Sequence, residues 1–196
     1  MHFLITCKLV VGIFTMLAFS QLVASDSPSP GSYEQLLLQR LSVAETEVEG
    51  RLAESAVWEH WFDEAPDEQV HEWLQQGRKK RESYDYSAAQ ALFDQVVEAA
   101  PDYAEGYNQR AFVRFLREDF DGSLADLEKT LEFKPWHFGA LSGMYHVLRL
   151  QNRHAAAFEL LSQAVAIHPW IQERGALPKE MWPDNYRLLH EPGQEI

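Results

Sequence analysis

The chain has 196 residues, 46% of them hydrophobic and 24% charged, with a formal net charge of −13 at pH 7. This length is enough for one domain with a sizeable core, and the strong negative charge disfavours binding to nucleic acid or to anionic lipid surfaces. Cys7 is the only cysteine of the sequence, which excludes an internal disulfide and a thiolate metal site.

The N-terminal residues have the pattern of an export signal. Lys8 precedes an apolar run from Leu9 to Phe19, and small residues at the spacing that signal peptidases cleave follow in AFS and VAS. The sequence therefore predicts a signal peptide over residues 1–25. The alternative is an uncleaved membrane anchor, although the run is short for a span of about 20 residues. Residues 26–32, rich in serine and proline, are expected to form a linker.

Helical periodicity begins at Tyr33, and the chain shows no convincing strand pattern outside the signal. Residues 33–69 are predicted to form an N-terminal helical cap that includes the motif Trp58-x-x-Trp61-Phe62. The stretch from Glu45 to Glu72 carries ten acidic residues against Arg51 alone, and it is interpreted as a solvated helix face, with an acidic recognition surface as the alternative.

A repeat follows, because Pro101, Pro135 and Pro169 are each separated by 34 residues. With the proline near the end of each unit, the repeats occupy residues 70–103, 104–137 and 138–171. In the first unit, small residues at Gly77 and Ala89 would let two helices approach closely, and Phe93 would fill the space beside them. The third unit has Tyr145 where a small residue is expected, which puts close packing of its two helices in doubt.

The ends of the second helix of each unit are also marked in the sequence. Asp85 and Asp119 precede apolar helical stripes and are predicted to be N-caps, because their side chains accept hydrogen bonds from the first free amides. Each proline is expected to end such a helix, since the residue before a proline is pushed out of the α region.

The region from Val70 to Pro169 resembles tetratricopeptide repeat (TPR) proteins, on the strength of the three prolines in register, Trp73-x-x-x-Gly77 and Ala89-x-x-x-Phe93. The resemblance implies an all-α fold, an αα-superhelix of helix pairs with caps at both ends. Together with the signal and the sequences AEGYNQRA and HFGALSG, the chain is similar to small exported TPR proteins of Gram-negative bacteria, which implies a periplasmic location.

The resemblance places the ligand face on the concave side, formed by the first helix of each pair. The residues carried over as candidates for peptide binding are Arg78, Arg81, Asn108, Gln109, Phe112, His146 and Arg149. Amides suit a peptide backbone, and arginines suit an acidic or carboxylate-bearing partner. The alternative for Phe112 and Phe115 is packing against the next repeat or a terminal helix. The carboxylate-gripping pattern of some TPR adaptors is not transferred, because Leu74, Gly139 and Gly143 depart from it.

Other chemical patterns are weak. The basic run Arg78–Arg81 is interpreted as a solvated helix face, and the eight histidines lack metal-binding spacing. Neither a nucleophile motif nor a phosphate loop is present in the sequence, so we expect no cofactor, no metal and no enzymatic activity. Residues 172–196 are predicted to form a C-terminal cap and a tail that is disordered over its last residues, EPGQEI.

The function expected from these features is non-catalytic binding of a protein or peptide in the periplasm. Two alternatives stay open: a structural subunit tethered to the inner membrane by an uncleaved N-terminus, and an unrecognised hydrolase. A membrane enters only if the signal is uncleaved.

Overall fold

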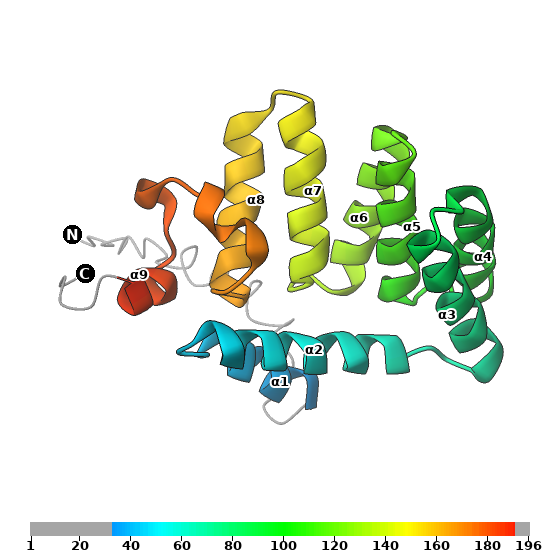
Figure 1. The fold of residues 1–196 in the computed structure, drawn as a ribbon, viewed down its shortest axis with the longest axis horizontal. Coiled ribbons are helices and arrows are strands. Elements are labelled where there is room, and N and C mark those ends of the chain that lie inside the picture. Colours follow the sequence, from blue (N-terminus) through cyan, green and yellow to red (C-terminus); the bar gives the residue numbers. More distant parts are fainter. Residues whose placement is uncertain (1–32, 191–196) are drawn as a thin grey trace, which may run out of the picture.

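The computed structural model describes residues 33–190, and within this range the chain is helical and contains no strand, which confirms the predicted all-α class. The signal peptide, the linker and the final tail predicted from the sequence lie outside the described residues. The α-helices, labelled in Figure 1, are α1 (Tyr33–Ser42), α2 (Glu47–Asp63), α3 (Glu68–Glu82), α4 (Tyr86–Ala99), α5 (Ala104–Leu116), α6 (Phe120–Phe133), α7 (Phe138–Leu150), α8 (His154–Ile167) and α9 (Asp184–His190).

Helices α3 to α8 form three successive pairs that stack side by side (Figure 1). The second helix of each pair ends two residues before the proline that marks the 34-residue period. The turn inside each pair also repeats, because Tyr84, Glu118 and Asn152 have positive φ angles of 63°, 65° and 59°. These positions, again 34 residues apart, reverse the chain with a left-handed residue, a feature that the residue types alone do not reveal.

The close approach predicted inside the first pair is present. A Cβ atom added to Gly77 would lie 2.5 Å from a ring carbon of Phe93, so this position admits no larger residue without movement. In the third pair Tyr145 is buried between α7 and α8, 6.3 Å from the ring centroid of Phe158, and its hydroxyl accepts a hydrogen bond from Arg149. The large residue is therefore accommodated within the core of the third pair.

Side-chain caps begin most of these helices. Asp85 accepts a hydrogen bond from the amide of Ala88, and Asp119 accepts one from the amide of Gly122, which confirms both predicted N-caps. His137 caps α7 through Nδ1, a role that the sequence reading did not assign. These bonds satisfy amides that the helix itself leaves without a partner.

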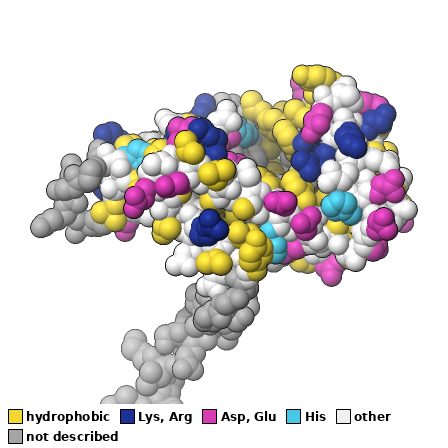
Figure 2. All heavy atoms as spheres, turned by 60° about the horizontal axis from the view of Figure 1, so that its bottom comes forward, with side chains coloured by type: hydrophobic (Ala, Val, Ile, Leu, Met, Phe, Trp, Pro, Cys, Tyr) yellow, Lys and Arg dark blue, Asp and Glu magenta, His cyan; other side chains and the backbone are white. Residues whose placement is uncertain are grey.

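Helix α2 does not continue the stack of pairs. In Figure 1 it runs below the lower ends of α8 and α7 toward α5 and α6 and connects to α3 through a loop, and α1 lies against its outer side. The region predicted as an N-terminal cap thus contacts the third pair as well as the first, because Trp58 and Trp61 of α2 pack on Phe138 at the start of α7. Figure 2 brings this side forward and shows acidic and hydrophobic side chains mixed across it.

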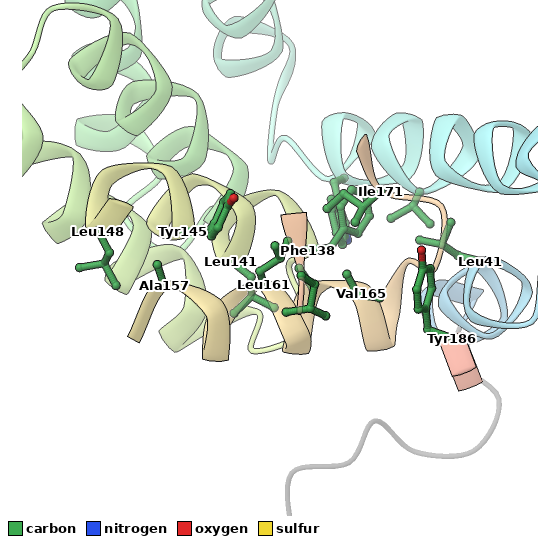
Figure 3. Close-up of a cluster of buried hydrophobic side chains, with 14 of the residues drawn as sticks. Leu41, Phe138, Leu141, Tyr145, Leu148, Ala157, Leu161, Val165, Ile171 and Tyr186 are labelled. Atoms are coloured by element: carbon green, nitrogen blue, oxygen red, sulfur yellow. The ribbon is translucent and has the colours of Figure 1, made fainter. Parts of the chain in front are cut away.

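The largest hydrophobic cluster joins the two ends of the described chain. Leu41 of α1, Phe138 of α7 and Tyr186 of α9 belong to the same buried cluster, which Figure 3 shows between the helices. The C-terminal segment reaches it through two 3-10 turns, Gln172–Ala176 and Lys179–Met181. Both terminal regions therefore cover the third pair and fix α2 in its crossing position. Among residues 33–190 no helix combines the length and hydropathy that a bilayer span requires.

Candidate functional site

Helix α2 and the first helices of the three pairs enclose a cleft of about 870 Å³. The walls come from α2 on one side and from α3, α5 and α7 on the other, so the cleft exists only because α2 crosses the superhelix. A cavity of this size is in the range of ligand sites in proteins. Its lining includes Trp58, Glu59, Phe62, Asp63, His71, Gln75, Arg78, Arg81, Asn108, Gln109, Phe112, Phe115, Ser142, His146 and Glu173.

The structure brings most of the predicted site residues together and excludes one. Those that line the cleft are Arg78, Arg81, Asn108, Gln109, Phe112 and His146. Arg149 does not line it: the side chain faces a separate cavity of about 370 Å³ and donates a hydrogen bond to the Tyr145 hydroxyl at 2.9 Å. The expectation that Arg149 flanks the central amides is therefore wrong, because one further turn of α7 carries it past the cleft.

Two arginines of α3 enter the cleft without a carboxylate partner among the described residues. The Arg78 guanidinium stacks over the Phe62 ring at 4.0 Å, and its Nε is buried without a hydrogen bond. The Arg81 guanidinium lies 4.8 Å from the Phe112 ring centroid and donates to the Gln109 side chain. Burial, and after it the like charge of Arg78, lower the pKa of Arg81, yet an arginine stays charged at neutral pH.

The amides of α5 are held by a buried carboxylate. Glu105 is 1% exposed and accepts hydrogen bonds from Asn108 Nδ2 at 3.2 Å and from Gln109 Nε2 at 2.5 Å. That these two amides contact a ligand backbone stays a prediction; in this structure each donates to Glu105, as a buried carboxylate requires. Their interaction with Glu105 also fixes Gln109 where it accepts from Arg81.

A histidine completes this network. His137 is buried, and its Nδ1 accepts from the amide of Ala140 at 3.0 Å. Nε2 is therefore the protonated ring nitrogen and donates a hydrogen bond to Glu105 Oε2 at 3.0 Å. The His137 ring also stacks on Trp61 of α2, with 4.0 Å between ring centroids. Glu105 occupies a concave-face position of the second repeat, but neither its burial nor the capping role of His137 was predicted, because the only signal in the sequence is a polar residue within the apolar pattern of a repeat.

The apolar part of the cleft is supplied by α5. Phe112 is 47% exposed and directed into the cleft, whereas Phe115 is partly covered by Phe120, at 5.9 Å between ring centroids. The packing alternative applies to Phe115 in part, because its ring also lies 6.3 Å from that of His146 in the third repeat, and not to the exposed Phe112. At the far end His146 pairs with Glu173 at 2.9 Å. Burial raises the pKa of Glu173, but hydrogen bonds from His146, from the backbone and from Ser142, together with the charge of His146, lower it further than burial raises it, so the net shift is downward.

A second pair of arginines lies between the helices of the repeats. Arg110 binds Asp126 through two hydrogen bonds of 2.8 and 2.7 Å and also contacts Asp94 at 3.0 Å. Arg114 reaches the same Asp126 at 2.9 Å. Hydrogen bonds to Asp126 raise the pKa of Arg110 against the opposing effect of burial. These residues link α4, α5 and α6 and leave Arg110 without spare capacity for a carboxylate ligand.

One acidic group resembles a metal site in outline. Glu34, His60 and Glu64 present ligand atoms within 4.8 Å of one another. The ammonium of Lys134 lies among them, at 2.6 Å from Glu34 and 3.0 Å from Glu64. Burial raises the pKa of Glu34, but hydrogen bonds from Lys134, Trp136 and Trp61 lower it further than burial raises it. The cluster is therefore explained as an ion pair that anchors α1 and α2.

Comparison with known proteins adds relatives of part of the chain. No family model matches the chain. Over 82 residues it is 34% identical to a TPR repeat-containing protein of Rhizobium etli, covering 42% of this chain and 40% of that protein. Over 65 residues it is 37% identical to a tetratricopeptide repeat protein 36 homolog of Nematostella vectensis, covering 33% of this chain and 36% of the relative. The chain thus spans less than half the length of these curated relatives.

Solved structures of TPR domains share the fold of this chain. The TPR2B domain of yeast Sti1, in its complex with pHsp70, is 21% identical with a TM-score of 0.52, and the match covers 63% of this chain and 98% of that domain. The TPR2AB region of yeast Sti1, in its complex with pHSP90, is also 21% identical, with a TM-score of 0.51, covering 81% of this chain and 61% of that one. The predicted αα-superhelix is confirmed.

Proposed function

Because the chain carries tetratricopeptide repeats, we propose that it is a non-catalytic scaffold that binds a segment of another protein in the cleft between α2 and α3, α5 and α7. The observation that carries this proposal is the state of Arg78 and Arg81. Two half-buried cations, one on the partly buried ring of Phe62 and one on the exposed ring of Phe112, have no carboxylate partner among the described residues, and such groups bind carboxylates strongly when they are kept from water.

The relatives support a protein or peptide as the ligand class. Both Sti1 structures are complexes, one with pHsp70 and one with pHSP90. Those partners belong to Sti1, and for this chain we propose only the general class of ligand, a protein or peptide. The exposed ring of Phe112 beside the arginines adds apolar area, which suits a peptide side chain better than a small inorganic ion.

The proposed location is the periplasm, with residues 1–25 removed as a signal peptide. The competing candidate is a subunit tethered to the inner membrane, which requires the apolar run from Leu9 to Phe19 to be retained as an anchor although it is short for a bilayer span. N-terminal sequencing of the protein recovered from cells separates the two: export predicts that the first residue is Asp26 or, with the other cleavage signal, Gln21, whereas a tether predicts that the apolar run is retained.

Site-specific photo-crosslinking tests the binding proposal in cells. A photoreactive phenylalanine analogue replaces Phe112 in the full chain, and the matched control carries the same analogue at Tyr84, which is 80% exposed and outside the cleft. We expect a discrete adduct with another protein from position 112 and none of the same mass from position 84.

The adduct must also depend on the arginines. Adding Arg78→Gln and Arg81→Gln to the position-112 protein should remove the adduct while the protein still folds. Equal adducts from positions 112 and 84, or an adduct that persists without the arginines, would refute the cleft as the binding site.

A further inference from the structure

The cleft has a charged wall on each side. On α3, Arg78 and Arg81 are three residues apart and face the cleft. On α2, Glu59 and Asp63 are four residues apart, which places them on one helical face, and both line the same cleft. The cleft therefore presents a cationic wall and an anionic wall to whatever enters it.

The two walls do not neutralise each other. The ion pairs of the described residues involve carboxylates other than Glu59 and Asp63. The side chains of these two residues form neither an ion pair nor a hydrogen bond within that part of the chain. Arg78 lies on the Phe62 ring instead. Opposite charges that line one cavity without contact leave both walls available to a ligand.

Aromatic rings lie among the charges. Trp58 and Phe62 come from α2 with the acidic wall, and Phe112 and Phe115 come from α5 beside the arginines. A ligand that fits has an apolar middle and charges of opposite sign on either side. The net charge of −13 adds a second selection, because it repels a purely acidic peptide from the whole molecule.

We propose that the cleft recognises a bipolar peptide segment, in which an acidic residue and a basic residue flank apolar residues. The acidic residue pairs with Arg78 and Arg81, the basic residue pairs with Glu59 and Asp63, and the apolar residues lie on Phe112. This inference rests on the cleft being the binding site and specifies the chemistry of its ligand.

Binding of synthetic peptides tests the inference. The probes are short fluorescent peptides, capped at both ends so that no terminal charge contributes, with identical apolar residues. They carry an acidic and a basic residue, the acidic residue alone, the basic residue alone, or neither, and the separation of the two charges grows residue by residue through the bipolar series. Fluorescence anisotropy with the protein gives each Kd.

We expect one spacing of the bipolar peptide to bind at least about tenfold more tightly than either singly charged peptide, as charge-assisted contacts of ordinary strength imply. The double variant Arg78→Gln, Arg81→Gln should abolish the advantage of the acidic residue only. The double variant Glu59→Gln, Asp63→Asn should abolish the advantage of the basic residue only.

Matched controls remove charges of the same sign outside the cleft. Lys79→Gln on α3 and Glu98→Gln on α4 replace exposed residues that do not line it, and they should leave every Kd unchanged. Circular dichroism melting of all variants shows that they fold.

Three results would overturn the inference: equal affinity of the acidic and the bipolar peptides, an advantage that survives neutralisation of its wall, or no binding of any bipolar peptide. If the bipolar peptides fail while the adduct from position 112 forms, the ligand chemistry is wrong and the proposed function stands. If both fail, the proposed function falls with it.

Discussion

The molecule contains two pairs of arginines, each about one helical turn apart, in different surroundings. Arg110 and Arg114 of α5 share the buried carboxylate of Asp126, and Arg110 also contacts Asp94. Arg78 and Arg81 of α3 are also partly buried, but neither forms an ion pair with a carboxylate among the described residues: Arg78 stacks on Phe62, and Arg81 lies on Phe112 and donates to Gln109. The pKa of Arg110 is raised by its carboxylates, whereas the pKa of Arg81 is lowered by burial and by Arg78.

The difference separates a structural role from a binding role. A half-buried cation that is fully paired holds neighbouring helices together, and removal of its partner costs stability. A half-buried cation without a carboxylate has lost part of its hydration and has gained little in return, so an anionic ligand group restores what is missing. We therefore expect substitutions at Arg110 and Arg114 to affect unfolding and substitutions at Arg78 and Arg81 to affect binding.

The largest effect is expected from Asp126→Ala. The substitution leaves Arg110 and Arg114 without their shared carboxylate, and the free energy of unfolding should fall by about 3 kcal/mol. Urea denaturation followed by circular dichroism measures it. Asp121→Ala, at an exposed position of the same helix, is the control and should change little. A loss no larger than that of the control would show that this arginine pair is not structural.

Glu105→Gln should have the next largest effect. The new amide brings a donor toward the amide donors of Asn108 and Gln109, so one hydrogen bond is lost in a buried place and the free energy of unfolding falls by about 2 kcal/mol. The peptide affinity should also weaken, because Gln109 holds Arg81. Urea denaturation tests the first effect and fluorescence anisotropy the second, with exposed Glu118→Gln as control. Unchanged stability would mean that the Glu105 network does not position the cleft.

Phe112→Glu gives Arg78 and Arg81 the carboxylate that they lack. The Phe112 ring centroid lies 4.8 Å from the Arg81 guanidinium, so a carboxylate at this position should compete with the acidic residue of the bipolar peptide and weaken binding about tenfold. Phe112→Gln removes the ring without adding charge and separates the two causes. Similar Kd values for the Glu and Gln variants would argue against the arginines as the anion site.

The smallest effect is expected for the stability of the double variant Arg78→Gln, Arg81→Gln relative to the unsubstituted protein. Because no carboxylate is left behind, the free energy of unfolding should change by no more than about 0.5 kcal/mol. The same substitution at Arg110 should cost several times as much. If the two sites lose equal stability in urea denaturation, the distinction between the pairs fails.

The repeat units were predictable because their signal is local and periodic. Gly77 and Phe93 meet as their spacing predicted, and Asp85 and Asp119 cap the helices that they precede. Such features depend on residues close in sequence, and a 34-residue period states them three times.

The crossing of α2 was not predictable in the same way, because it depends on contacts between distant parts of the chain. Its clearest trace is Gly139, where an added Cβ atom would lie 2.5 Å from the Trp58 ring. The resemblance marked Gly139 only as a departure from a ligand pattern, whereas the structure shows that its small size admits the tryptophan. The commitment of Asn108 to Glu105 was missed for a similar reason, since burial of a polar residue leaves no periodic signal.

The most direct test of the central claim is a spectrum that contains both arginine pairs. Side-chain Nε–H resonances of nitrogen-15-labelled protein, assigned with single Arg→Lys variants, are followed as the bipolar peptide is added. Our account predicts that the resonances of Arg78 and Arg81 shift saturably while those of Arg110 and Arg114 remain in place. Shifts confined to Arg110 and Arg114, or no shift at Arg78 and Arg81 with the peptide bound, would contradict it.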